Sequence, residues 1–379
     1  MMSNAARHFC HEHAGCRMEG YPPQIPSWAG PNFQDDTALE NLVETSDLDV
    51  EVPRDEWHAI TPETPDGWRV GDWDERPVRF VDGSDKGDTV AWLRGPLGHP
   101  IPVRFSQIGS VVVEVIAGER FRTFDICEPV VSMVADAFEW DEVEAFAAEL
   151  QDNGIRLLPA QKPDGVLSYD FETMRKAAQN RCNDEMGILE ELAIAQQPHK
   201  VTVVDGRLEP RTGGFTPAES PLIGVIKSHR EIYLHPGGLQ LLYGLSSGQR
   251  TPVFRILKTR KKTETGIELK DINLPVASWY LKLAGGVGTM PTWGYVRVEV
   301  AWAWFEKRGF AAADSRMTPE GHHWVNFLSR ALCEYRCRDN NYGRAAVSLD
   351  PIVRAEQLLA ATFEAHHALV NRFYRITGL

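Results

Sequence analysis

The stretch Arg79-Phe80-Val81-Asp82-Gly83-Ser84 predicts a short apolar strand that carries a carboxylate to its end and then turns at a glycine. An Asp-Gly pair of this kind is most often only a hairpin turn. The chain repeats the pattern in Lys200-Val201-Thr202-Val203-Val204-Asp205-Gly206, again a β-branched apolar run followed by Asp-Gly. If the two strands are neighbours in one sheet, the two carboxylates lie side by side.

Around these two runs, the hydrophobic pattern predicts an α/β protein. An antiparallel meander is expected first, with strands at 78–82, 89–94, 101–105, 110–116 and 121–124. Later strands are expected at 200–205, 222–226, 252–257, 276–283 and 293–304. Helices are expected at 130–150, 169–197 and 350–376.

The N-terminal 60 residues differ from the rest of the chain in charge. They hold 3 Lys and Arg against 11 Asp and Glu, a net charge of −8 out of −13 for the whole protein. They also contain several prolines and show no sustained hydrophobic period. We therefore expect residues 1–60 to be a long acidic extension and residues 61–379 to form the main domain.

The composition is that of a soluble protein. The 379 residues are 43% hydrophobic, but no apolar run approaches the ~18 residues that cross a bilayer. The six cysteines are widely spaced, which fits free thiols in a reducing compartment better than a disulfide framework. The sequence predicts a cytoplasmic protein with no membrane association.

Two further carboxylates interrupt apolar helix faces. Glu185 shares a face of the helix 169–197 with apolar residues, and Glu356 does the same in the helix 350–376. A carboxylate on such a face is costly unless it is paired or binds a cation. Glu185 can equally lie at the edge of its helix, and Glu190 is the alternative acid there.

Together these acids predict a metal site. Asp82, Glu185, Asp205 and Glu356 follow the order of the carboxylates in nucleases with an RNase H-like sheet, in which strand ends and flanking helices hold two divalent metals. Gathered carboxylates need cations between them, and Mg²⁺ or Mn²⁺ prefers oxygen ligands. Lys227, at the end of the strand 222–226, can hold a phosphate or be an ordinary strand-end lysine.

At these residues the sequence resembles the NurA nucleases. The resemblance rests on Phe80-Val81-Asp82-Gly83-Ser84, on Val203-Val204-Asp205-Gly206-Arg207-Leu208 and on stretches at 181–185, 224–228, 278–283 and 296–300. It covers about 78–360. It implies an RNase H-like fold, with Asp82, Glu185, Asp205, Lys227 and Glu356 as catalytic residues and the four acids among them as metal ligands.

The resemblance also implies an activity and partners. It implies two-metal, Mn²⁺- or Mg²⁺-dependent hydrolysis of DNA, as a single-strand endonuclease and 5′-to-3′ exonuclease. It implies a homodimer that acts with a HerA-type hexameric ATPase in DNA end processing or phage defence. Archaeal members of the family have a histidine where this chain has Glu356. The alternative is therefore a catalytically inactive adaptor of such an ATPase.

A local basic run interrupts the acidic chain. Lys258, Arg260, Lys261 and Lys262 lie within five residues of one another and are candidates for phosphate contacts. Such runs are often only solvated loops or hairpin tips. DNA binding at this run is therefore an expectation to be weighed against simple solvation.

Overall fold

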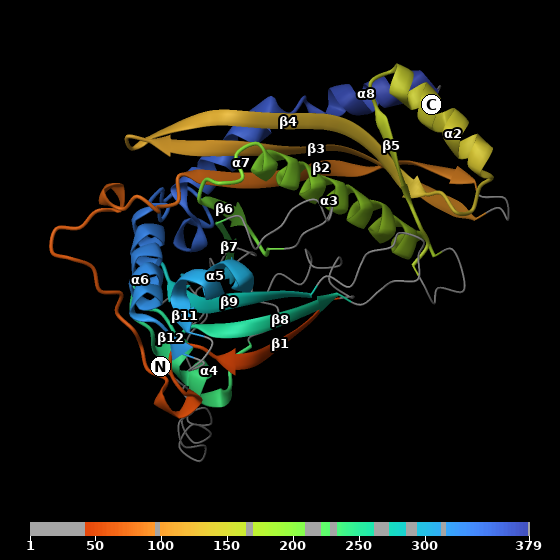
Figure 1. Cartoon of the computed structure of the whole chain (residues 1–379). Coiled ribbons are helices and arrows are strands. Elements are labelled where there is room, and N and C mark those ends of the chain that lie inside the picture. The colour runs from red at the N-terminus through yellow and green to blue at the C-terminus, as the bar shows by residue number, and fades with distance from the viewer. Residues whose placement is uncertain are drawn as a thin grey trace, which may run out of the picture.

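A computed structural model describes residues 42–94, 99–163, 170–208, 221–227, 233–260, 273–285, 294–311 and 316–377. They form a mixed sheet of ten strands in the order β1-β8-β9-β10-β7-β6-β2-β3-β4-β5, flanked by helices (Figure 1). The strands are β1 (Leu42–Asp49), β2 (Arg79–Arg94), β3 (Pro100–Ile116), β4 (Glu119–Val134), β5 (Arg156–Ala160), β6 (Thr202–Asp205), β7 (Leu222–Ile226), β8 (Phe254–Arg260), β9 (Asn273–Lys282) and β10 (Tyr295–Ala301). A small separate sheet pairs β11 (Phe310–Ala311) with β12 (Arg316–Met317).

The helices lie between and after these strands. They are α2 (Trp140–Asp152), α3 (Phe171–Ala195), α4 (Pro236–Gly244), α5 (Trp302–Gly309), α6 (Pro319–Glu334), α7 (Asp350–Thr362) and α8 (His366–Thr377). Short 3₁₀ turns are η3 (Arg54–Glu56), η4 (Val70–Asp72) and η5 (Ala345–Val347). None of the helices in the described ranges is long and apolar enough to cross a membrane.

The middle of the sheet has the predicted RNase H-like arrangement. β2, β3 and β4 form an antiparallel meander, α3 follows, and β6 and β7 then add to the other side of β2 as parallel strands. The prediction of an α/β fold with a mixed sheet flanked by helices is confirmed.

Helices α3 and α7 cover opposite faces of this meander. Successive side chains of a strand point to opposite faces. Val112 of β3 accordingly packs against Ala193 and Ile194 of α3, whereas its neighbour Val111 packs against Leu359 of α7. The centre of β2 is therefore enclosed by a helix on each side.

Two predicted helices were wrong in extent. The helix expected at 130–150 begins only at Trp140, because the apolar run before it continues β4 in the sheet and is buried there. The helix expected at 350–376 is broken into α7 and α8. At the break, the side-chain amide of Gln107 donates to the Glu364 carbonyl and accepts from the Glu364 N–H, both at 2.8 Å.

The strand expected at 293–304 ends at Ala301, where α5 begins.

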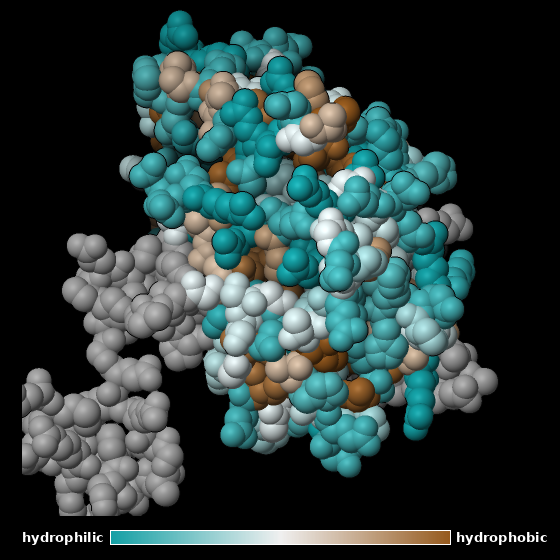
Figure 2. Space-filling view, turned by 90° about the vertical axis from the view of Figure 1, so that its left-hand side faces the viewer, coloured by the Kyte–Doolittle hydropathy of each residue, from teal (hydrophilic) through white to brown (hydrophobic). Residues whose placement is uncertain are grey.

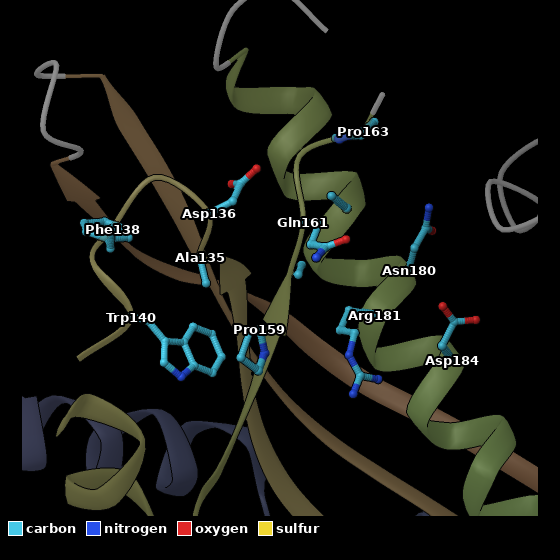
Figure 3. A pocket seen from close by; sticks show the side chains of 12 residues that line it. Ala135, Asp136, Phe138, Trp140, Pro159, Gln161, Pro163, Asn180, Arg181 and Asp184 are labelled. Atoms are coloured by element: carbon cyan, nitrogen blue, oxygen red, sulfur yellow. The ribbon is translucent and has the colours of Figure 1, made fainter. Parts of the chain in front are cut away.

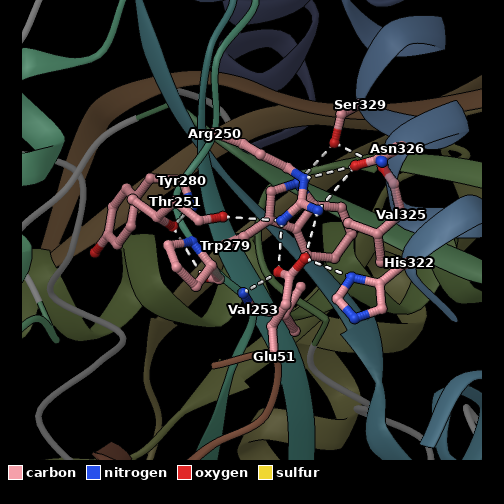
Figure 4. Close-up of polar contacts among 11 residues, drawn as sticks. Glu51, Arg250, Thr251, Val253, Trp279, Tyr280, His322, Val325, Asn326 and Ser329 are labelled. Carbon is pink, nitrogen blue, oxygen red and sulfur yellow. Dashed lines mark hydrogen bonds and ion pairs between the residues drawn. The ribbon is translucent and has the colours of Figure 1, made fainter. Parts of the chain in front are cut away.

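Part of the N-terminal segment belongs to the folded unit, although residues 1–41 lie outside the described residues. β1 pairs with β8 at the edge of the sheet. Just after it, the buried carboxylate of Glu51 accepts two hydrogen bonds from Arg250, at 2.6 and 2.7 Å, and faces His322 Nδ1 at 2.9 Å (Figure 4). This network connects the N-terminal segment to α6.

Exposed large hydrophobic side chains are spread over several elements. Figure 2 shows one face of the molecule, on which hydrophobic residues form separate areas among hydrophilic ones. The large exposed examples are Trp92, Ile116, Phe121, Trp140, Leu192 and Tyr243. Their scatter over β2, β3, β4, α2, α3 and α4 does not mark a dimer surface, and the homodimer stays a prediction.

Candidate metal centre

Two parallel strands bring Asp82 and Asp205 together. β2 and β6 pair in register with Val81 beside Val204, so the residue that follows each of these valines lies at the same level of the sheet. The predicted turn after Asp82 is absent, because β2 runs on to Arg94 and Asp82 pairs with Val111 in mid-strand. The strand that ends here is β6, whose last residue is Asp205. Because β6 goes no further, there is space beside Asp82.

Helix α7 brings the third carboxylate from one face of the sheet. One carboxylate oxygen from each of Asp82, Asp205 and Glu356 lies within 4.8 Å of the other two. Asp82 is buried, and the other two are partly buried. Side chains from residues as far apart as 82 and 356 thus share one small volume.

Lys227 lies at the same place. β7 pairs in parallel with β6, with Val225 opposite Asp205, and Lys227 follows two residues later on the same face. Its Nζ is 2.7 Å from Asp205 Oδ2 and 3.7 Å from Glu356 Oε1. Burial by itself would lower the pKa of Lys227, but the charges of Asp205, Asp82 and Glu356 outweigh it and raise the pKa. The ammonium group therefore stays charged.

The single positive charge of Lys227 does not balance the negative charges of the three carboxylates. Burial, with the charge of Asp205 next, raises the pKa of Asp82 well above its ordinary value. Such a cluster is stabilised by a further cation, and carboxylate oxygens are the ligands that Mg²⁺ and Mn²⁺ prefer. The three acids therefore fit a divalent metal ion.

The structure places Glu185 outside this cluster. It lies in α3 between two arginines, at 2.6 Å from Arg156 Nη1 and 2.8 Å from Arg181 Nη1. Burial alone would raise the pKa of Glu185, but these two hydrogen bonds outweigh it and hold the pKa below its ordinary value. Its carboxylate is satisfied by protein cations.

Glu190, the alternative acid of α3, is the one that approaches the cluster. A Cβ atom added at Gly83, next to Asp82, would lie 2.7 Å from Glu190 Oε1. The charge of Glu190 also contributes to the raised pKa of Asp82, after burial and the charges of Asp205 and Glu356. Gly83 thus leaves room for the Glu190 carboxylate on the α3 side of β2, although the group of three close acids does not include Glu190.

Tyr342 is a site residue that sequence reasoning missed. Its hydroxyl donates a hydrogen bond of 2.5 Å to Glu356 Oε2, on the carboxylate whose other oxygen faces Lys227. Burial, with this hydrogen bond next, raises the pKa of Tyr342. The tyrosine lies in an irregular segment before α7, where no periodicity could have identified it.

Comparisons with known structures find distant matches, one of which is a nuclease. The crystal structure of the NurA nuclease from Sulfolobus solfataricus matches over 76% of this chain and 82% of that chain, with 11% sequence identity and a TM-score of 0.32. No family model and no curated protein matches the sequence.

The part of the predicted basic run that lies in β8 is remote from this centre in the sheet. Lys261 and Lys262 lie outside the described residues, and Lys258 and Arg260 are in β8, with side chains that are also outside them. In the strand order, β9, β10, β7 and β6 lie between β8 and β2. DNA binding at this run stays a prediction.

A cavity of about 570 Å³ lies elsewhere, between β5, α3 and the start of α2 (Figure 3). Its walls include Trp140, Pro159, Arg181 and Asp184. None of the three clustered carboxylates lines it, and Arg181 is committed to Glu185. The carboxylate cluster, and not this cavity, holds the chemistry that the sequence predicts.

Proposed function

We propose that this protein is a metal-dependent nuclease that hydrolyses phosphodiester bonds in DNA. The observation that carries the proposal is the convergence of Asp82, Asp205 and Glu356, with Lys227 in contact, in the middle of an RNase H-like sheet. Like charges gathered at such short range, with one of them buried, are typical of functional sites.

Asp82, Asp205 and Glu356 would hold Mn²⁺ or Mg²⁺, with Glu190 as the fourth acid. When bound, two such ions supply an activated water and stabilise the charge that develops on the phosphate. Lys227 stays charged and can neutralise a phosphate oxygen at the same place. Tyr342 orients the Glu356 carboxylate through its hydrogen bond.

The finer parts of the proposal rest on the sequence resemblance. They are single-strand endonuclease and 5′-to-3′ exonuclease activity, a homodimer, and action with a HerA-type hexameric ATPase in DNA end processing or phage defence. One observation favours the alternative of a catalytically inactive adaptor. Lys227 neutralises part of the carboxylate cluster.

The test combines metal binding with cleavage. Calorimetry should detect Mn²⁺ binding to the unmodified chain at or below millimolar metal, and Mn²⁺ should support cleavage of single-stranded DNA. Asp205→Asn keeps the shape of the side chain but removes its charge, and should lower cleavage by at least about 10²-fold. Asp136→Asn, at an exposed carboxylate of the cavity wall, is the matched control and should cleave normally.

The outcomes separate the two functions. Full cleavage by the Asp205→Asn variant would overturn the assignment of the site. A chain that binds no Mn²⁺ at millimolar concentration and cleaves nothing would be an adaptor, with Lys227 serving as the permanent counter-ion of the acids.

A further inference from the structure

The segment 336–344, between α6 and η5, is joined directly to the carboxylate cluster. Tyr342 in this segment donates a hydrogen bond to the carboxylate of Glu356, whose other oxygen faces Lys227. Backbone hydrogen bonds shape the segment, from the Cys337 N–H to the Ser348 carbonyl at 2.8 Å and from the Tyr342 N–H to the Asp339 carbonyl at 3.1 Å. The segment therefore forms part of the rim of the proposed active site.

This segment is locally basic in an acidic protein. It holds three arginines, Arg336, Arg338 and Arg344, against one acid, Asp339, a net charge of +2 in a chain of −13. Arg336 Nη1 donates to the Leu283 carbonyl at 3.1 Å and so has a structural partner. The guanidinium groups of Arg338 and Arg344 make no hydrogen bond or ion pair to any residue in the described ranges.

A nucleic acid that reaches this cluster must bring phosphates toward several carboxylates. Phosphates that flank the cleaved bond are held by arginine and lysine side chains in nucleic-acid complexes. Lys227 is already bound to Asp205 and close to Glu356, so it can contribute little to the flanking positions. Arg338, which is exposed, and Arg344, which is half-buried, are the other two arginines of the segment that Tyr342 joins to the cluster.

We propose that Arg338 and Arg344 bind the phosphate backbone of a single-stranded nucleic acid next to the proposed active site. This inference rests on the proposed nuclease function, and it adds a phosphate-binding segment that Tyr342 holds against Glu356. The arginines position the strand and read no base, so binding is independent of sequence.

The experiment measures binding without turnover. Fluorescence anisotropy of a labelled oligothymidylate of about 15 nucleotides is recorded against salt concentration, with the full chain and with EDTA to remove divalent metal. We expect Arg338→Ala and Arg344→Ala each to raise Kd about tenfold. Each should also reduce the slope of log K against log salt by about 0.7, the value for one lost phosphate contact on a single strand.

Matched controls distinguish a direct contact with phosphate from an effect of the protein's overall charge on binding. Arg375→Ala removes an exposed arginine in the last turn of α8, outside the segment 336–344, and should leave both Kd and the slope unchanged. Arg338→Lys keeps the charge and should retain the slope. If the control weakens binding as much as Arg338→Ala, or if neither rim variant changes Kd, the proposal is overturned.

Failure of this inference can be told apart from failure of the nuclease assignment, because binding needs no metal and no cleavage. Binding that depends on Arg338 in a chain that never cleaves DNA would keep the phosphate site and remove the nuclease. If the unmodified chain cleaves DNA but both rim variants bind it with an unchanged Kd, the nuclease assignment stands and the phosphate site is overturned.

Discussion

At the scale of single residues, the two glutamates of α3 have different surroundings. Glu185 and Glu190 are five residues apart in one helix, and both are compatible with the sequence pattern. Arg156 and Arg181 neutralise Glu185, whereas Glu190 reaches Gly83 beside Asp82. Their neighbours in space, and not their helix positions, separate their roles.

This difference predicts that a change from Glu to Gln has different effects at the two positions. Glu190→Gln should lower Mn²⁺-dependent cleavage at least about tenfold, because it removes a carboxylate from beside the cluster. Glu185→Gln should leave cleavage near normal and lower the free energy of unfolding by about 1 kcal/mol, since its arginine partners are partly exposed. Cleavage assays and urea unfolding of both variants check this, and equal loss of cleavage would contradict it.

Tyr342 offers a second test at this scale. Tyr342→Phe keeps the ring but removes the hydrogen bond to Glu356, and should weaken Mn²⁺ binding about tenfold. Tyr374→Phe removes a hydroxyl that donates to the Val90 carbonyl instead, and is the control. Calorimetric Kd values that are equal for the two variants would show that Tyr342 has no influence on the metal site.

At the scale of elements, the continuity of β2 determines the site. The sequence pattern predicts two short strands, 78–82 and 89–94, because the residues between them are polar or glycine. The structure joins them, since Ser84 to Lys86 pair with β3 and the Asp85 carboxylate is neutralised by Arg104 at 2.8 Å. Asp82 is thereby held in the rigid middle of a strand, with Gly83 beside it.

A change from Gly to Ala should have different consequences at two positions of β2. A Cβ at Gly83 meets only the flexible end of Glu190, so Gly83→Ala should displace that carboxylate and lower cleavage while costing little stability. A Cβ at Gly87 would lie 2.4 Å from the Phe105 carbonyl oxygen, so Gly87→Ala should lower the free energy of unfolding by about 1–3 kcal/mol. Thermal unfolding and cleavage rates distinguish them, and normal cleavage by Gly83→Ala would contradict the role of Glu190.

At the scale of the whole molecule, contacts between distant parts of the chain hold the sheet together. Glu51, after β1, is bound by Arg250 and His322, and its carboxylate also accepts from the Val253 N–H at 2.8 Å. Burial alone would raise the pKa of Glu51, but the hydrogen bonds from Arg250 and His322 outweigh it and lower the pKa to about 2. The acidic N-terminal segment thus supplies one buried anion that the fold needs.

The lowered pKa of Glu51 predicts an acid-sensitive part of the stability. A carboxyl group whose pKa is lower in the folded state than in the unfolded state stabilises the fold above its unfolded pKa, near 4.5, and loses this contribution as the pH falls toward 2. The full difference is about 3 kcal/mol, of which about 2 kcal/mol is lost by about pH 3.

Denaturant unfolding between about pH 5 and pH 3 tests this contribution. The unmodified chain should lose about 2 kcal/mol more than Glu51→Gln, which cannot titrate at this position. The Gln variant should be less stable at neutral pH, because Arg250 is left buried without its anion. Parallel pH dependences for the two proteins would show that Glu51 does not titrate as proposed.

The sequence by itself determined the local elements and the candidate acids. β-branched runs and apolar periodicity act within a few residues, so the strands around Val81 and Val204 and the helix α3 could be predicted. Only the tertiary structure decided the continuity of β2, the break after α7, the position of Glu190 near Gly83 and the hydrogen bond of Tyr342 to Glu356. The physical reason is that these features depend on partners far along the chain, such as Gln107 for Glu364 and Arg156 for Glu185, which neither propensity nor period encodes.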